Sequence, residues 1–75
     1  MKYTNYKVMM LDSANNRYET ISNCNYSKKE AEDWIKLYDP NNEKILKIIS
    51  ERKDLNDYSK EDQRYIKEKL NEVRV

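Results

Sequence analysis

Residues 25–40 read NYSKKEAEDWIKLYDP, and this stretch decides the fold class because it marks both ends of a helix. Ser27 followed by Glu30 is a capping box, in which the serine hydroxyl accepts a hydrogen bond from the third helical amide. Pro40 ends the helix, since the residue before a proline is driven out of helical geometry. Between these limits, apolar side chains recur at the spacing of one helix face, namely Ala31, Trp34, Ile35 and Tyr38.

A partial echo of this stretch follows in residues 57–70, DYSKEDQRYIKEKL. Ser59 is placed to cap a second helix, with acids in the first turn, where the helix dipole favours negative charge. The apolar stripe of this helix would be formed by Ile66, Leu70 and Val73. Aligning the two stretches requires a gap, so a recurrent way of starting a helix is favoured over an internal duplication.

Two strands are predicted before the first helix. Residues 6–11 alternate in a pattern typical of β-structure, and residues 17–24 contain side chains that suit a pleated surface. Asn15 and Asn16 lie between them, and Asn tolerates the left-handed backbone that a tight hairpin turn requires. The sequence therefore predicts a β-hairpin.

Residues 44–50, KILKIIS, fit either a helix or a strand. A strand is favoured, because a two-stranded hairpin alone is marginal and a third strand would complete a sheet. Residues 51–57 are then predicted to be a polar linker. The sequence predicts a single α+β domain over residues 1–75, in the order β-β-α-β-α, with the helices packed on one face of a small antiparallel sheet.

The chain lacks the usual means of catalysis. It has no His and no Gly among its 75 residues, so the commonest general base and the glycine-rich phosphate loops are missing. Its carboxylate pairs lie beside Lys or Arg at helical spacing, a pattern typical of solvated ion pairs. We therefore expect a protein that is not an enzyme and that uses no cofactor or metal.

Cys24 is the single cysteine, which rules out an internal disulfide and favours a reducing compartment. We expect it to fill the end of a strand as a small apolar group rather than to act as a reactive thiol. No hydrophobic run in the sequence is long enough to cross a membrane, and the first residues are not those of a signal segment. These features predict a cytoplasmic protein.

The start of the first helix is a candidate anion site. Ser27, Lys28 and Lys29 would offer free amides and two ammonium groups to a phosphate or sulfate. Glu30 competes for the same amides, so a plain helix cap is the favoured interpretation.

The tyrosines are the second candidate for binding. Seven are more than a core this small can bury while their hydroxyls find partners. Spacing assigns Tyr6, Tyr26, Tyr38 and Trp34 to the core. Exposed Tyr beside Arg suits protein interfaces, so the candidate partner-binding residues are Arg17, Tyr18, Tyr58, Arg64 and Tyr65.

The layout resembles the short, Gly-poor proteins encoded by bacteriophages and mobile elements of low-GC bacteria, anti-CRISPR proteins among them. The hairpin around Asn15 and Asn16, the helix from Ser27 to Trp34 and the Ile-rich segment after Pro40 carry this resemblance. It implies a non-enzymatic inhibitor or regulator that covers the surface of a larger bacterial protein or nuclease complex. A small nucleic-acid-binding regulator is the alternative. Pairing of open sheet edges would also allow a homodimer.

Overall fold

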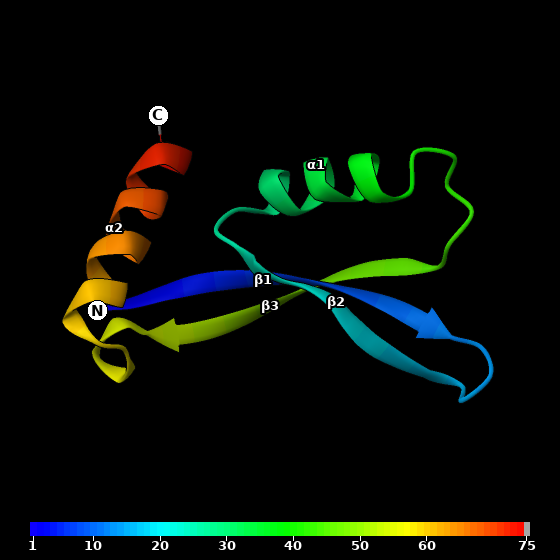
Figure 1. Ribbon diagram of the computed structural model, residues 1–75, viewed down its shortest axis with the longest axis horizontal. Helices are drawn as coiled ribbons and strands as arrows, with labels where there is room; N and C mark the ends of the chain where they lie inside the picture. The colour runs from blue at the N-terminus through cyan, green and yellow to red at the C-terminus, as the bar shows by residue number, and fades with distance from the viewer. Residues whose placement is uncertain (75) are drawn as a thin grey trace.

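The computed structural model describes residues 1–74 and consists of a three-stranded antiparallel sheet with two α-helices (Figure 1). The elements follow the predicted order β-β-α-β-α, which confirms the α+β class. They are β1 (Lys2–Asp12), β2 (Arg17–Asn25), α1 (Lys28–Tyr38), β3 (Leu46–Asp54), the short 3-10 helix η1 (Leu55–Asp57) and α2 (Lys60–Arg74). The strand order is β2-β1-β3, so β1 is central and the other two strands form the edges.

The predicted hairpin is present, and its turn depends on one left-handed residue. Asn16 has a φ of 53°, a region that costs most L-residues energy and that Asn tolerates. Asp12 holds the turn from inside, since its carboxylate accepts from the Ala14 amide at 3.0 Å and from the Asn15 side chain at 2.7 Å. Asn16 thus takes the left-handed position that glycine commonly has in such turns, and the two hydrogen bonds to Asp12 stabilise the turn.

The two ladders of β1 differ in regularity. With β3, the register runs without a shift from Lys2 opposite Asp54 to Met10 opposite Leu46. With β2, it shifts twice around Val8, and the extra residues lie on β2. A bulge of this kind bends the bulged strand and increases its local twist. β3 is therefore the regular edge of the sheet and β2 the distorted one.

The third strand confirms one prediction and corrects another. Residues 44–50 were expected to contribute a strand, and β3 begins at Leu46. The polar linker predicted for residues 51–57 is wrong, because β3 continues to Asp54 and Leu55 is only 1% exposed. β1 starts earlier than expected, and its ladder of backbone hydrogen bonds orders a segment whose side chains alone resemble a loop.

α1 begins and ends where the sequence indicates. The Ser27 hydroxyl accepts from the Glu30 amide at 3.0 Å, and Asp39 caps the other end before Pro40. Ala31 of α1 and Val8 of β1 are both fully buried. Val8 pairs with Ser22, and Ser22 lines the same hollow as Trp34 of α1, so α1 covers the side of β1 to which Val8 points.

The core prediction for Tyr38 is wrong. Its side chain is 42% exposed and stacks on the partly buried Trp34, with 4.8 Å between ring centroids. Tyr38 is the last residue of α1, and its ring contacts Trp34 and the ammonium group of Lys44. Asp39 directly after it is buried, where its carboxylate accepts from the amides of Glu43 and Lys44, each at 2.9 Å.

A second apolar cluster lies at the other end of the sheet. It contains Tyr3, Leu55, Ile66 and Leu70, with Tyr26 and Tyr58 packed against it. The Ser59 hydroxyl accepts from the Asp62 amide at 3.2 Å, which confirms the predicted cap of α2. Ile66 and Leu70 are buried as expected, whereas Val73 at the end of the stripe is exposed. Sequence spacing gave Tyr3 no role, yet this residue connects α2 to β1.

The two helices pack against side chains on opposite sides of β1. Val8 under α1 and Tyr3 beneath α2 are five residues apart in a strand without a register shift against β3, so they leave it on opposite sides. The strand twists between these two residues, so opposite sides of β1 at its two ends can face the same direction in space. In Figure 1 both helices rise on one side of the molecule, with α1 along the middle of the sheet and α2 at one end.

Leu55 is the first test of this core. Replacing Leu55 by Ala should lower the free energy of unfolding by about 3 kcal/mol, because it leaves a cavity among well-packed neighbours. Urea unfolding followed by circular dichroism measures the loss. Ile45→Ala is the control, since Ile45 is 60% exposed and its truncation should change stability by less than about 0.5 kcal/mol. Equal losses in the two variants would contradict the assignment of Leu55 to the core.

The turn gives a second prediction. Asn16→Ala should lower the free energy of unfolding by about 1 kcal/mol, because a Cβ without a polar group is disfavoured at positive φ. Asn16→Gly should cause no loss, since glycine adopts this backbone freely. Thermal unfolding of both variants tests the contrast, with Ser13→Ala as a neutral change in the same turn. If alanine and glycine behave alike at position 16, the turn is not set by this residue.

Candidate functional site: the uncovered part of the sheet

The side of the sheet that α1 does not cover can be read from the strand register. Residues directly opposite each other in an antiparallel pair have their side chains on the same side. Met9 lies between Thr20 on β2 and Lys47 on β3. Leu11 lies between Tyr18 and Ile45, because its amide donates to the Ile45 carbonyl at 2.9 Å. All of these side chains lie on the side of the sheet that faces away from Val8 and α1.

These side chains form an exposed apolar area, which we call the open sheet surface. It consists of Met9, Leu11, Tyr18, Thr20, Ile45, Lys47 and Ile49. Tyr18 is 37% exposed and Ile45 and Ile49 are exposed as well, while Met9 and Leu11 are half-buried. α1 covers the other side of the sheet and α2 lies at its opposite end (Figure 1), so neither helix covers these side chains. Contiguous apolar surface of this kind marks interaction sites more often than isolated exposed residues do.

Two side-chain contacts fix the geometry of the open sheet surface. The ammonium group of Lys47 lies 3.8 Å from the ring centroid of Tyr18, a cation–π contact across three strands. The Thr20 hydroxyl donates to the Met9 sulfur at 3.1 Å. The surface thus presents an ordered aromatic ring with a positive charge over it, surrounded by aliphatic side chains.

A charged cluster separates the open sheet surface from the core beneath α2. The Glu51 carboxylate lies 2.7 Å from the Lys7 ammonium group and 2.6 Å from that of Lys53. Hydrogen bonds from Lys53 and Lys7 hold the pKa of the Glu51 carboxyl below its ordinary value. The hydrogen bond that Lys53 donates to Glu51 also raises the pKa of the Lys53 ammonium group. Glu51 is therefore the anionic centre of a group that is otherwise positive.

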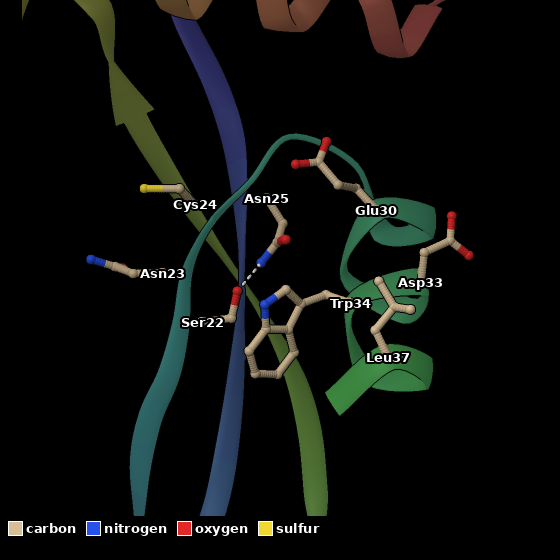
Figure 2. Close-up of a pocket in the computed structure, with 8 residues that line it drawn as sticks. All are labelled: Ser22, Asn23, Cys24, Asn25, Glu30, Asp33, Trp34 and Leu37. Carbon is tan, nitrogen blue, oxygen red and sulfur yellow. Dashed lines mark hydrogen bonds between the residues drawn. The ribbon is translucent and has the colours of Figure 1, made fainter. Parts of the chain in front are cut away.

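A shallow hollow lies on the other side of the sheet, beside α1, and has a volume of about 520 Å³. Figure 2 shows Trp34 lying across it toward Ser22, whose hydroxyl accepts from the Asn25 side chain at 2.9 Å. Leu37 at its rim is 86% exposed. The carboxylate of Asp33 is paired with Lys29 at 2.9 Å. The lining combines the Trp34 ring and the Leu37 side chain with the carboxylates of Glu30 and Asp33, a mixture that suits contact with a partner.

The expectation that Cys24 fills a strand end is wrong, because this residue is exposed. Figure 2 shows its thiol and the side chain of Asn23 pointing away from α1. Asn25 takes the buried place instead: its amide donates to the Tyr6 carbonyl at 2.9 Å, and its backbone donates to the Asn5 side chain at 3.2 Å. A buried amide can satisfy the irregular backbone of β2, which a thiol cannot do.

The predicted partner-binding residues do not form one surface. Arg17 and Tyr18 start β2, but only Tyr18 belongs to the open sheet surface, because Arg17 pairs with Asp12 on the Val8 side. Arg64 and Tyr65 are exposed on α2 at the opposite end of the molecule. Tyr58 is half-buried and packs on the core. Burial and a hydrogen bond with Tyr58 raise the pKa of the Tyr3 hydroxyl, so Tyr58 has a structural contact to make.

The candidate anion site is placed among acids. Ser27 is occupied as the helix cap, Lys28 is exposed, and Lys29 pairs with Asp33. Glu30, Asp33 and Glu72 line the same depression as Ser27 and Lys29. Ser27 and Lys29 thus share a depression with three carboxylates, and Lys28 does not line it.

Of the seven residues of the open sheet surface, the predicted partner-binding residues included only Tyr18. The aliphatic side chains Leu11, Ile45 and Ile49 were among those missed. The sequence feature that could have revealed this surface is the run KILKIIS, whose apolar residues would lie on both sides of a strand. A strand with apolar side chains on both sides is buried only when other elements pack on both sides. Over that part of the sheet, α1 packs on one side and, within residues 1–74, no helix packs on the other.

Residues 1–74 contain no group of three or more Cys, Asp or Glu side chains arranged to hold a metal ion. Neither of the helices described has the length and apolar character required to span a bilayer.

The charged cluster gives a pH prediction. Because the folded pKa of Glu51 lies below its ordinary value, its contribution to stability is present at neutral pH and is lost as the pH falls through the folded pKa. Glu51→Gln should therefore flatten the acid side of the stability curve. Urea unfolding at several pH values measures this, with Glu32→Gln on the exposed side of α1 as the control. A wild-type curve and a Glu51→Gln curve that stay parallel into acid would contradict the assignment.

Comparison of this chain with protein-family models, with curated proteins and with solved structures finds no significant match.

Proposed function

We propose that this chain is a binding protein that acts by covering part of the surface of a larger bacterial protein, without covalent chemistry of its own. The open sheet surface is the contact region. The main supporting observation is that apolar side chains from all three strands are exposed or half-buried on one side of a sheet whose other side is covered by α1.

The size of the domain supports this function. A chain of 75 residues has little apolar material, and leaving several large side chains in water forgoes stability that burial would supply. Their exposure lowers the stability of the free chain, and burial against a partner would recover that free energy. Each of the larger side chains would contribute about 1 to 2 kcal/mol when it enters an apolar contact.

The chemistry of the surface indicates the kind of partner that it fits. Tyr18 with Lys47 over its ring offers a rigid aromatic contact, and Tyr at the centre of an interface is a common source of binding energy. Lys7, Lys47 and Lys53 leave the border positive apart from Glu51. The complementary partner surface is an apolar patch bordered by carboxylates.

Inhibition would follow from occlusion. A domain 40 Å in its longest dimension can cover a substrate channel or a docking site on a larger protein. The partner class that the sequence resemblance implies, a bacterial nuclease complex, is consistent with that mode of action. Loss of cleavage on adding the purified chain would identify such a target.

The test is affinity capture from a bacterial lysate with matched variants. Wild-type chain should retain a partner in stoichiometric amount, and Ile45→Asp should reduce that amount about tenfold or more, because it buries a charge in an apolar contact. Leu37→Asp is the matched control, since Leu37 is also an exposed aliphatic residue but lies on α1. Tyr65→Ala reports on the α2 surface.

Four outcomes would decide against the proposal. No stoichiometric partner, or a partner lost equally with Ile45→Asp and Leu37→Asp, would exclude the open sheet surface. Loss with Tyr65→Ala alone would move the contact to α2. Material that disappears when the lysate is treated with nuclease, and whose retention falls steeply as salt rises, would identify a nucleic-acid ligand instead.

A further inference from the structure

The two edges of the sheet are protected to different degrees. Exposed edge strands are commonly blunted by bulges, proline or short length. β2 carries two register shifts, whereas β3 has nine residues, no proline and an unbroken register with β1. β3 is thus a long and regular edge that another strand could extend.

The register shows which backbone groups of β3 point outward. The Leu11 amide donates to the Ile45 carbonyl, and the Leu55 amide donates to the Met1 carbonyl, each at 2.9 Å. Hydrogen-bonded positions alternate along an antiparallel strand, so odd-numbered residues of β3 bond to β1. The amides and carbonyls of Leu46, Ile48, Ser50 and Arg52 therefore point away from the sheet.

The charges of β3 are complementary to those of a second β3 in one antiparallel register. When Ile49 lies opposite Ile49 of the second copy, Lys47 lies opposite Glu51 of that copy, and the reverse pair forms by symmetry. Opposite charges directly across two strands are favourable, and like charges are not.

The neighbouring symmetric registers lack this match. Centring the pair on Ser50 places Lys47 opposite Lys53, and centring it on Ile48 leaves Lys47 opposite Ile49. Centring it on Glu51 or on Lys47 places a charge opposite its own copy. One register is therefore selected by charge alone.

We propose that two copies of this chain form a symmetric dimer through their β3 edges, in antiparallel register about Ile49. The two sheets, each of three strands, then join into one continuous sheet of six. The two-fold axis is perpendicular to the sheet, so both open sheet surfaces lie on the same side and meet at Ile49. The dimer is a property of the chain alone and does not rest on the proposed function.

Disulfide trapping tests the register directly. Position 49 is a non-hydrogen-bonded site across the outer edge, where Cα atoms of opposite residues are about 4.5 Å apart, within the range for a disulfide. In a Cys24→Ser background, which removes the exposed native thiol, Ile49→Cys should give a covalent dimer on mild oxidation. Ile45→Cys should not, because that position lies opposite Lys53 of the second copy. Crosslinking at position 45 equal to that at 49, or at neither, would overturn the register.

Charge exchange between two chains tests the pairing of Lys47 with Glu51. Lys47→Glu and Glu51→Lys, each studied alone, should raise the dimer dissociation constant about tenfold, because two attractive pairs become repulsive. Mixing the two variants should restore dimerisation, since the heterodimer contains two attractive pairs. Sedimentation equilibrium across a concentration series measures all three samples, and circular dichroism verifies their fold.

Wild-type chain that stays monomeric throughout that series would refute the dimer, and it would leave partner capture through the open sheet surface unaffected. Mixed variants that dimerise no better than each variant alone would show that Lys47 does not face Glu51.

Discussion

The pairing of β1 with β3 is the interaction on which the rest of the structure depends. It joins residues as distant as Lys2 and Asp54, and closing so long a loop costs conformational entropy before any contact compensates it. Once formed, the ladder brings the Leu55 amide to the Met1 carbonyl and the Leu55 side chain against Tyr3. α2 then has an apolar surface on which Ile66 and Leu70 can pack.

Helix length explains why part of the sheet is left uncovered. An α-helix of eleven residues is about 16 Å long, whereas a strand of eleven residues extends for about 36 Å. α1 can therefore cover less than half of β1, and α2 covers only the end near Tyr3. The open sheet surface lies on the side opposite to α1, at the end of the sheet away from α2, so its apolar side chains stay in contact with water.

Glu51 is central to the charged cluster and to the proposed dimer. Lys7, Lys53 and Glu51 lie between the buried cluster and the open sheet surface, and their half-buried ion pairs contribute modestly to stability. In the proposed dimer, Glu51 would face Lys47 of the second copy, so its position along β3 matters more than the energy of these ion pairs. Charges along a regular edge strand oppose most pairings with other strands and so limit aggregation, and the proposed register is the one that they would permit.

Local chemistry in the sequence was sufficient to predict both helices, the Asn16 turn and the element order. Helix caps, proline and left-handed asparagine act within a few residues, and their energies do not depend on the rest of the chain. The end of β3, the burial of Tyr3, Leu55 and Asn25, and the exposure of Cys24 and Tyr38 were decided by the tertiary structure. They follow from strand register, bulges and helix length, which are set only when distant segments pair. The open sheet surface belongs to this second group, because the sequence states which side chains share a side of a strand but not which side will be covered.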